Sequence, residues 1–188
     1  MEKNIINYKE IILSVAKKIA KNQGITNINI RTVAKNSDIA IGTVYNYFPS
    51  KGDLLVAVIE DFWIGAFAEI NWQSFEWSNF YDNIEKVYVI LYSYLKNFKE
   101  NWLEQLALLK SQEKLLGRQK ENEFFRKIYN RIINLMDMDD DIKLYQWSET
   151  ITKEKVAEFI FENMINLLRK DTKDISFFIE ILKKIMSN

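Results

Sequence analysis

Residues 30–48 are the stretch of this sequence that most restricts how the chain can fold. Apolar side chains recur there twice at helical spacing, in residues 30–34 and again in residues 41–48. The turn-forming residues at 36–38 separate the two runs. Pro49 ends the second run, because the residue before a proline disfavours the helical conformation. The pattern predicts two short helices joined by a tight turn, an arrangement in which the second helix can enter the major groove of DNA.

The second of these helices has two faces of different chemistry. At about 100° per residue, Ile41, Val44 and Phe48 fall on one side, with Tyr45 at its edge. The other side carries no carboxylate and consists of Gly42, Thr43, Asn46 and Tyr47. An amide can pair with adenine, a threonine methyl can touch thymine, and hydroxyl groups suit phosphate oxygens. A plain surface helix in a bundle would show the same short pattern, and this alternative stays open on the helix alone.

The composition favours a helical protein and argues against an enzyme. One proline and five glycines among 188 residues are few for the turns of a sheet protein. Cysteine and histidine are absent, so the chain lacks thiols, the usual general base and the commonest metal ligand. No apolar run approaches the roughly 18 residues of a membrane span, and no signal-peptide pattern is present. We therefore expect an all-α, cytoplasmic protein without catalytic activity, membrane segment, metal or cofactor.

The charge distribution is compatible with a DNA-facing N-terminal part. The formal net charge of the chain is zero, which by itself is unlike a nucleic-acid binder. Residues 1–60, however, hold eight Lys and Arg residues against five Asp and Glu residues, a balance of +3. The remainder carries −3. The sign of this modest asymmetry is the one that attraction to phosphate requires.

Further helical patterns lie on both sides of residues 30–48. Asn29, Ser50 and Thr152 stand just before three of them, where a side-chain oxygen can cap the first free N–H groups. The isoleucines of residues 25–30 are expected to be buried in a loop. The acidic run at 137–141 is also expected to be a loop, since it lacks the glycine and distal glutamate of a calcium site. The other expected helices are 5–22, 51–70, 79–98, 101–116, 120–138, 152–169 and 175–186.

Residues 5–62 resemble the DNA-binding domain of the TetR family of transcriptional regulators. The match lies in residues 30–34 and 39–51, which include the run Gly-Thr-Val-Tyr-Asn-Tyr-Phe-Pro-Ser-Lys, and continues to Asp53 and the two leucines after it. The resemblance implies a three-helix DNA-binding domain with a helix-turn-helix, followed by a helical domain for effector binding and dimerisation. The implied domains are 1–50 and 51–188, linked through helix 51–70.

The resemblance also implies DNA-contacting positions. Tyr45, Tyr47 and Lys51 resemble phosphate-contacting residues, whereas Gly42 and Thr43 resemble positions that approach the bases. To these we add Arg31, which resembles an arginine that reaches the operator in some members, and Ile41 and Asn46 of the second helix. The expected DNA-binding residues are therefore Arg31, Ile41, Gly42, Thr43, Tyr45, Asn46, Tyr47 and Lys51.

Three residues depart from the family pattern. Ala40 stands where a capping Ser or Thr is common, which weakens the helix start by about 1 kcal/mol. Ile41 stands where a polar or basic residue is common, so a base contact there would be apolar. Asp38 replaces the usual turn glycine, and we expect the turn to survive because Asp tolerates the left-handed conformation.

The aromatic residues in the middle of the chain suggest where an effector could bind. Most of them are expected in the core. Ligand pockets are concave and mainly apolar, with a few oriented polar groups, and tyrosine and tryptophan supply both kinds of surface. The residues predicted to line a pocket for a hydrophobic or aromatic effector are Tyr88, Tyr92, Trp102 and Tyr129.

The last two expected helices, 152–169 and 175–186, carry broad apolar faces. In the resembled family the corresponding pair docks against a second copy of the chain in a four-helix dimer interface. Sequence alone also allows the simpler interpretation that these faces fill the core of one chain. A dimer is expected on functional grounds, because paired recognition helices read the two half-sites of a palindrome.

The leading interpretation is a ligand-responsive repressor. A homodimer would bind a palindromic operator in double-stranded DNA, and a small hydrophobic effector would release it. The alternative is a helical protein-interaction module that has lost DNA binding, favoured by Ala40, Ile41 and the zero net charge. An enzyme has no support from a Gly-rich phosphate loop or a paired-carboxylate motif.

Overall fold

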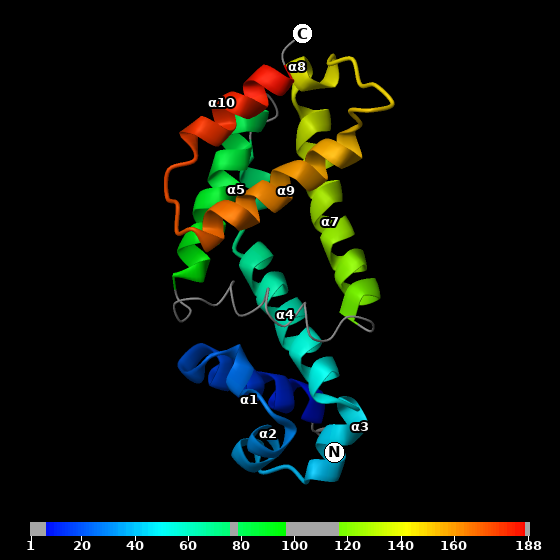
Figure 1. The fold of residues 1–188 in the computed structure, drawn as a ribbon, viewed down its shortest axis with the longest axis vertical. Helices are drawn as coiled ribbons and strands as arrows, with labels where there is room; N and C mark the ends of the chain where they lie inside the picture. Colours follow the sequence, from blue (N-terminus) through cyan, green and yellow to red (C-terminus); the bar gives the residue numbers. More distant parts are fainter. Residues whose placement is uncertain (1–6, 76–78, 97–116, 187–188) are drawn as a thin grey trace, which may run out of the picture. The chain divides into compact units, whose positions relative to one another are not determined.

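Every regular element among the described residues of this computed structural model is a helix (Figure 1). The structure describes residues 7–75, 79–96 and 117–186. The all-α prediction is confirmed for these residues. The expected helix at 101–116 lies outside them.

The described residues divide into two compact units. The first contains residues 7–64 and 117–121, and the second contains residues 65–96 and 122–186. The helix α4 (Lys51–Ala68) begins in the first unit and ends in the second.

The first unit is built from short helices whose apolar faces meet in one core. The helix α2 packs against both α1 and α3. Ile25 and Ile28, which lie between α1 and α2, are fully buried, as predicted from the sequence. The elements before α4 are α1 (Tyr8–Gln23), the 3-10 turn η1 (Ile25–Asn27), α2 (Ile30–Ser37) and α3 (Ile41–Tyr47).

Side-chain caps fix where the helices of the first unit begin. The backbone N–H of Thr32 donates to the Asn29 side chain at 2.8 Å and starts α2. At the start of α4, Ser50 and Asp53 cap each other's backbone N–H groups at 3.0 and 3.1 Å. Both caps were predicted. The helix α3 has no such bond at Ala40, as expected for a residue without a side-chain oxygen, and the lower stability of this helix start stays a prediction.

The second unit also consists of helices around an apolar core. The core side chains include Phe80 and Leu91 of α5, Ile132 of α7, Ile160 of α9 and Leu182 of α10, all at most 4% exposed. Thr152 caps α9, as predicted, by accepting a hydrogen bond from the Lys155 N–H at 3.3 Å. The elements are η2 (Trp72–Ser74), α5 (Phe80–Leu95), the part of α7 (Gly117–Met138) that follows residue 121, α8 (Asp140–Lys143), α9 (Lys153–Arg169) and α10 (Ser176–Ile185).

The expectation of a loop at 137–141 was wrong. The helix α7 continues to Met138, and the short helix α8 begins at Asp140. Asp139 between them is buried, and its carboxylate accepts hydrogen bonds from the backbone N–H groups of Phe80, Asp141 and Ile142. The physical reason for the error is that a run of acidic residues resembles a solvated loop, whereas one of them caps helix ends here.

Among the residues that the structure describes, no helix combines the length and the apolar character needed to cross a membrane. Within the same residues, no three His, Cys, Asp or Glu side chains are grouped so that they could hold a metal ion.

Candidate nucleic-acid interface

The helix α3 presents most of its circumference to solvent. Val44 and Phe48 anchor it in the core of the first unit, with 0% and 3% of their surface exposed. Ile41 is 42% exposed, although helical spacing puts it on the same side as these two anchors. Of the other predicted residues on the helix, Thr43 is half-buried. The rest are exposed, namely Gly42, Tyr45, Asn46 and Tyr47.

The turn before α3 holds the helix in place through backbone geometry. Asp38 adopts the left-handed conformation with φ 54° and ψ 38°, as the sequence predicted for this position. The Ile39 N–H then donates to the Ala34 carbonyl at 3.1 Å, which closes the end of α2. The side chain of Ser37 donates to the Val33 carbonyl at 2.7 Å. The turn therefore has a defined conformation, and α3 leaves it in one direction.

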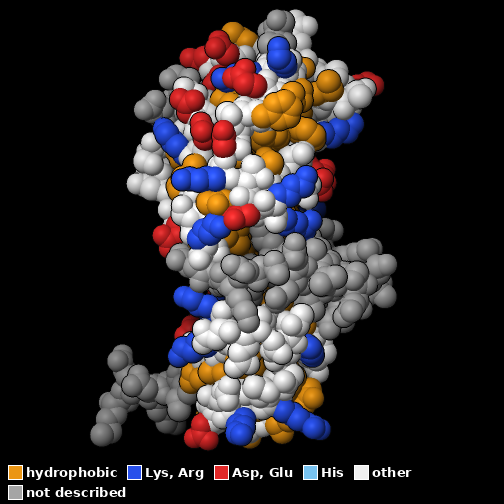
Figure 2. All heavy atoms as spheres, turned by 60° about the vertical axis from the view of Figure 1, so that its left-hand side comes forward, with side chains coloured by type: hydrophobic (Ala, Val, Ile, Leu, Met, Phe, Trp, Pro, Cys, Tyr) orange, Lys and Arg blue, Asp and Glu red, His pale blue; other side chains and the backbone are white. Residues whose placement is uncertain are grey.

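Two cationic residues flank α3 along the chain. Arg31 is the second residue of α2, and Lys51 is the first residue of α4, directly after the Ser50 cap. Both side chains are exposed. In the described chain, neither of them takes part in an ion pair, so both charges are available to an external anion. Figure 2 shows further Lys and Arg side chains on the lower body, which contains α1 to α3.

Gly42 lies at the centre of the exposed face of α3. Helical spacing puts it and Asn46 opposite the buried Val44. A Cβ atom built on Gly42 would meet no atom within 4 Å, so the packing of the described protein does not require a glycine here. The absence of a side chain leaves room for the close approach of another molecule.

The structure brings two of the predicted effector-pocket residues together. Tyr88 is fully buried, and its hydroxyl donates to the backbone carbonyl of Thr172. Burial, with smaller contributions from Tyr92 and Asp171, raises the pKa of Tyr88 to about 12. The ring of Tyr92 stacks on Tyr88 at 6.3 Å between centroids. Tyr88 therefore already uses its polar tip to hold the turn between α9 and α10.

The other two predicted pocket residues are Tyr129 and Trp102. Tyr129 of α7 packs edge-to-face on Phe161 of α9, with ring centroids 5.9 Å apart. Trp102 lies outside the described residues. The prediction that these four side chains line one pocket stays a prediction.

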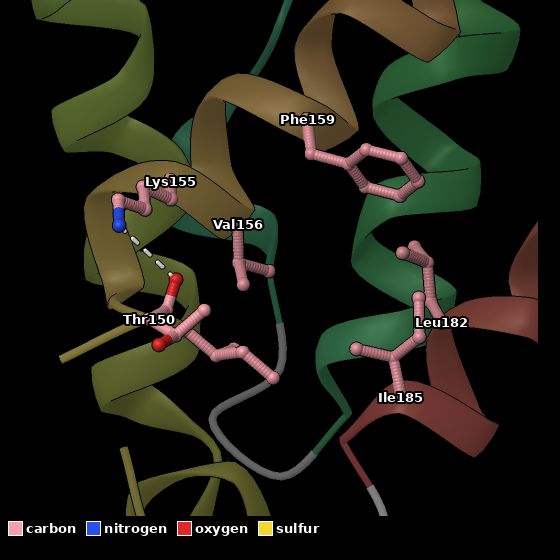
Figure 3. Close-up of a pocket in the computed structure, with 7 residues that line it drawn as sticks. Thr150, Lys155, Val156, Phe159, Leu182 and Ile185 are labelled. Carbon is pink, nitrogen blue, oxygen red and sulfur yellow. Dashed lines mark hydrogen bonds between the residues drawn. The ribbon is translucent and has the colours of Figure 1, made fainter. Parts of the chain in front are cut away.

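A different hollow opens on the surface of the second unit, between the start of α9 and the end of α10. It has a volume of about 200 Å³ and an apolar lining. In Figure 3 the side chains of Phe159, Leu182 and Ile185 face the hollow, and Lys155 donates to the Thr150 carbonyl at its rim, 3.2 Å away. The sequence predicted the apolar faces of both helices but did not predict the hollow. The hollow depends on how the two helices cross, which no local pattern indicates. The lining residues are Thr150, Ile151, Lys155, Val156, Phe159, Leu182 and Ile185.

An all-helical fold with an exposed helix-turn-helix face defines a class of DNA-binding transcriptional regulators. The sequence model for bacterial regulatory proteins of the tetR family matches residues 12–58, which include the whole face. An HTH-type transcriptional regulator of Staphylococcus aureus strain MRSA252 is 30% identical over 149 residues, which cover 76% of this chain and 74% of the relative. A regulator of strain USA300 is 29% identical over 148 residues, covering 75% and 74%. The chain belongs to the TetR family and is a DNA-binding transcriptional regulator.

Solved structures agree with this fold over almost the whole chain. The crystal structure of BioQ with its natural double-stranded DNA operator matches with a TM-score of 0.67 and 14% identity, covering 96% of this chain and 98% of BioQ. The regulator FadR from Bacillus subtilis, in complex with stearoyl-CoA, matches with a TM-score of 0.68 and 19% identity, covering 93% and 96%. At these identities the likeness establishes the fold.

Replacing Gly42 with alanine is expected to separate folding from DNA binding. The free energy of unfolding should stay unchanged or rise by up to about 1 kcal/mol, because alanine favours the helix and its methyl meets no atom. Affinity for operator DNA should fall about tenfold, because about 1.4 kcal/mol is lost when the methyl keeps the helix away from the base edges. Thermal melting and a gel shift on the same sample measure both effects. Unchanged affinity would show that the helix backbone does not approach the duplex at this point.

Proposed function

We propose that this protein is a ligand-responsive repressor that acts in the cytoplasm as a homodimer on a palindromic operator. The observation that carries the proposal is the exposed face of α3, which is uncharged and rich in hydrogen-bonding groups. In this proposal residues 1–50 form the DNA-binding domain, and residues 51–188 bind the effector and the second chain. The proposed DNA contacts are made by Arg31, Ile41, Gly42, Thr43, Tyr45, Asn46, Tyr47 and Lys51.

Six of these eight proposed contacts fall into two kinds. Lys51, Tyr45 and Tyr47 bind phosphates, because an ammonium group and phenols at the edges of the face suit backbone oxygens. Gly42, Thr43 and Asn46 approach the base edges from the middle of the face. Support for an operator-binding role comes from BioQ, whose structure was solved with its natural double-stranded DNA operator.

The experiment that tests this function is selection of bound sequences from random DNA with purified protein at a stated salt concentration. A palindrome with half-sites about one helical turn apart is expected, because two recognition helices of a dimer lie about 34–36 Å apart. Affinity should fall steeply as salt rises, since phosphate contacts release counterions. If the selection enriched no DNA sequence at any salt concentration, the result would favour the alternative, a protein-interaction module. The exposed apolar side chain of Ile41 is a surface that a protein partner could cover in that case.

The proposed homodimer forms through α9 and α10. Support comes from exposed apolar side chains on these helices: Phe159 is 42% exposed and borders the hollow, and Phe177 is still more exposed. Figure 2 shows hydrophobic side chains gathered on the surface of the upper body, which belongs to the second unit. Exposed apolar patches of this kind mark association surfaces.

Replacing Phe159 with glutamate is expected to weaken the dimer at least about 100-fold, because each interface would then bury an unpaired carboxylate in an apolar contact. Analytical ultracentrifugation over a concentration series measures the change. The matched control is Leu144→Glu, which puts the same charge on an apolar side chain 73% exposed at the end of α8. A wild-type protein that is monomeric at micromolar concentration, or a Phe159→Glu protein that dimerises like the control, would contradict the proposed interface.

The proposed effector is a small hydrophobic or aromatic molecule that binds within residues 51–188, with Tyr88, Tyr92, Trp102 and Tyr129 as the proposed contacts. Support comes from the packing of Tyr88 on Tyr92 and of Tyr129 on Phe161, and from FadR, which was solved with stearoyl-CoA. Such an effector releases DNA only if it binds the DNA-free conformation more tightly than the DNA-bound one. Repeating the DNA selection with candidate ligands present tests this step.

A further inference from the structure

We infer that α3 reads A·T base pairs, and that the exposed side chain of Ile41 packs on the C5 methyl group of a thymine in the operator. This inference rests on the proposed function, because it assumes that the exposed face of α3 lies in the major groove. It adds the chemical class of base pair that the face accepts and the residue that determines it.

The first argument is the chemistry that α3 lacks. Residues 41–47 contain no Lys, Arg, Asp or Glu. Guanine is most often read through a bidentate contact from Arg or Lys to O6 and N7, and cytosine is read by Asp or Glu through N4. The helix therefore has no charged group for either base of a G·C pair. Arg31 is the second residue of α2 and lies outside this face.

The second argument is the chemistry that α3 exposes. The amide of Asn46, at the centre of the face, can bond both N6 and N7 of adenine. The neighbouring Gly42 has no side chain, and a Cβ there would be in open space, so the amide can approach the base edge closely. The Asn46 amide beside Gly42 is therefore suited to bind an A·T pair.

The third argument is the exposure of Ile41. Its side chain is 42% exposed, while Val44 and Phe48, on the same side of the helix, are buried. The protein's own core thus leaves apolar surface uncovered at the first turn of the helix that carries Asn46. In the major groove, the thymine C5 methyl is the apolar group that a base pair displays. Removing both surfaces from water favours a thymine opposite Ile41 over the other bases.

The test replaces thymines of the selected operator with deoxyuridine, which lacks only the C5 methyl group. Replacement is made at one position at a time, symmetrically in both half-sites. At one operator position, this replacement should lower the affinity of the wild-type protein about tenfold. Two methyl contacts are then lost, one in each half-site. The Ile41→Ala protein should bind both operators with equal affinity. The matched control is Ile11→Ala, which shortens an isoleucine of similar exposure, 39%, on α1 and should keep the full methyl dependence.

A second variant makes the inference independent of a small affinity difference. Ile41→Lys gives α3 a group that binds guanine, so selection with this variant should change one base pair of each half-site from A·T to G·C. Both variants change an exposed side chain, and circular dichroism melting verifies that they fold.

The outcomes distinguish this inference from the function on which it rests. Wild-type protein that selects a palindrome but shows no methyl-sensitive thymine would overturn the reading of A·T pairs and leave the operator-binding function intact. The inference about A·T pairs would also be overturned if the wild-type protein selected G·C pairs at the positions whose base pair changes in the selection with Ile41→Lys. Wild-type protein that selects no sequence at all would instead overturn the proposed function.

Discussion

Replacing Tyr47 and Lys51 together with alanine is expected to lower operator affinity by roughly 1,000-fold while the protein stays folded and dimeric. Each side chain is proposed to make one phosphate contact in each half-site, so the dimer loses four contacts. At about 1 kcal/mol for each contact, the loss is about 4 kcal/mol, or three factors of ten. A gel shift or fluorescence anisotropy titration at fixed salt measures the change.

The single variants should differ in their salt dependence. Lys51→Ala removes one positive charge from each half-site, so the slope of log affinity against log salt should become shallower by about 2. Tyr47→Phe removes a hydroxyl and no charge, so affinity should fall while the slope stays unchanged. This difference separates a charge contact from a hydrogen bond to the same DNA backbone.

Folding is not expected to change, because both side chains are exposed and, within the described chain, neither forms a hydrogen bond or an ion pair. Lys86→Ala on α5 is the control for loss of an exposed lysine outside the first unit, and it should bind DNA like the wild type. If the double variant kept wild-type affinity and salt dependence, the exposed side of α3 and the start of α4 would not lie against the phosphates.

Local rules were sufficient to predict the helix-turn-helix unit from its residues. Asn29 and Ser50 cap helices because a short polar side chain reaches the first free N–H groups within its own turn. Asp38 enters the left-handed region because its side chain tolerates that conformation, and Ala40 leaves α3 without a side-chain cap. Each of these features depends on residues no more than five positions apart, so the sequence displays them directly.

Features that depend on distant segments could not be predicted in this way. Ile41 shares a helical side with Val44 and Phe48, yet it is exposed, because the core that covers those anchors does not extend to the start of α3. The hydroxyl of Tyr88 meets the carbonyl of Thr172, 84 residues later in the chain, and no local pattern indicates this contact. Periodicity gives the direction of a side chain and not the segment that it meets.

Asp139 is the clearest example of a residue whose role depends on a distant segment. It stands in an acidic run, but only 6% of its surface is exposed. One carboxylate oxygen accepts the N–H of Phe80 at 2.8 Å, which joins the start of α5 to a residue 59 positions later. The other oxygen accepts the N–H groups of Asp141 and Ile142, each at 3.0 Å, at the start of α8. A negative charge is favourable at both helix ends, because the free N–H groups there carry partial positive charge.

Replacing Asp139 with alanine is therefore expected to destabilise the protein by about 3 to 5 kcal/mol, since three backbone N–H groups lose a charged acceptor and two of them are buried. The melting temperature should fall by about 10 °C. Asp139→Asn keeps one carbonyl acceptor and should have an intermediate effect. Asp140→Ala is the matched control, because this neighbouring carboxylate is exposed and its loss should change stability by less than about 0.5 kcal/mol. If Asp139→Ala melted like the control, the carboxylate would contribute no net stability, and the joint between α5 and α8 would have to depend on apolar packing around Phe80 and Ile142 instead.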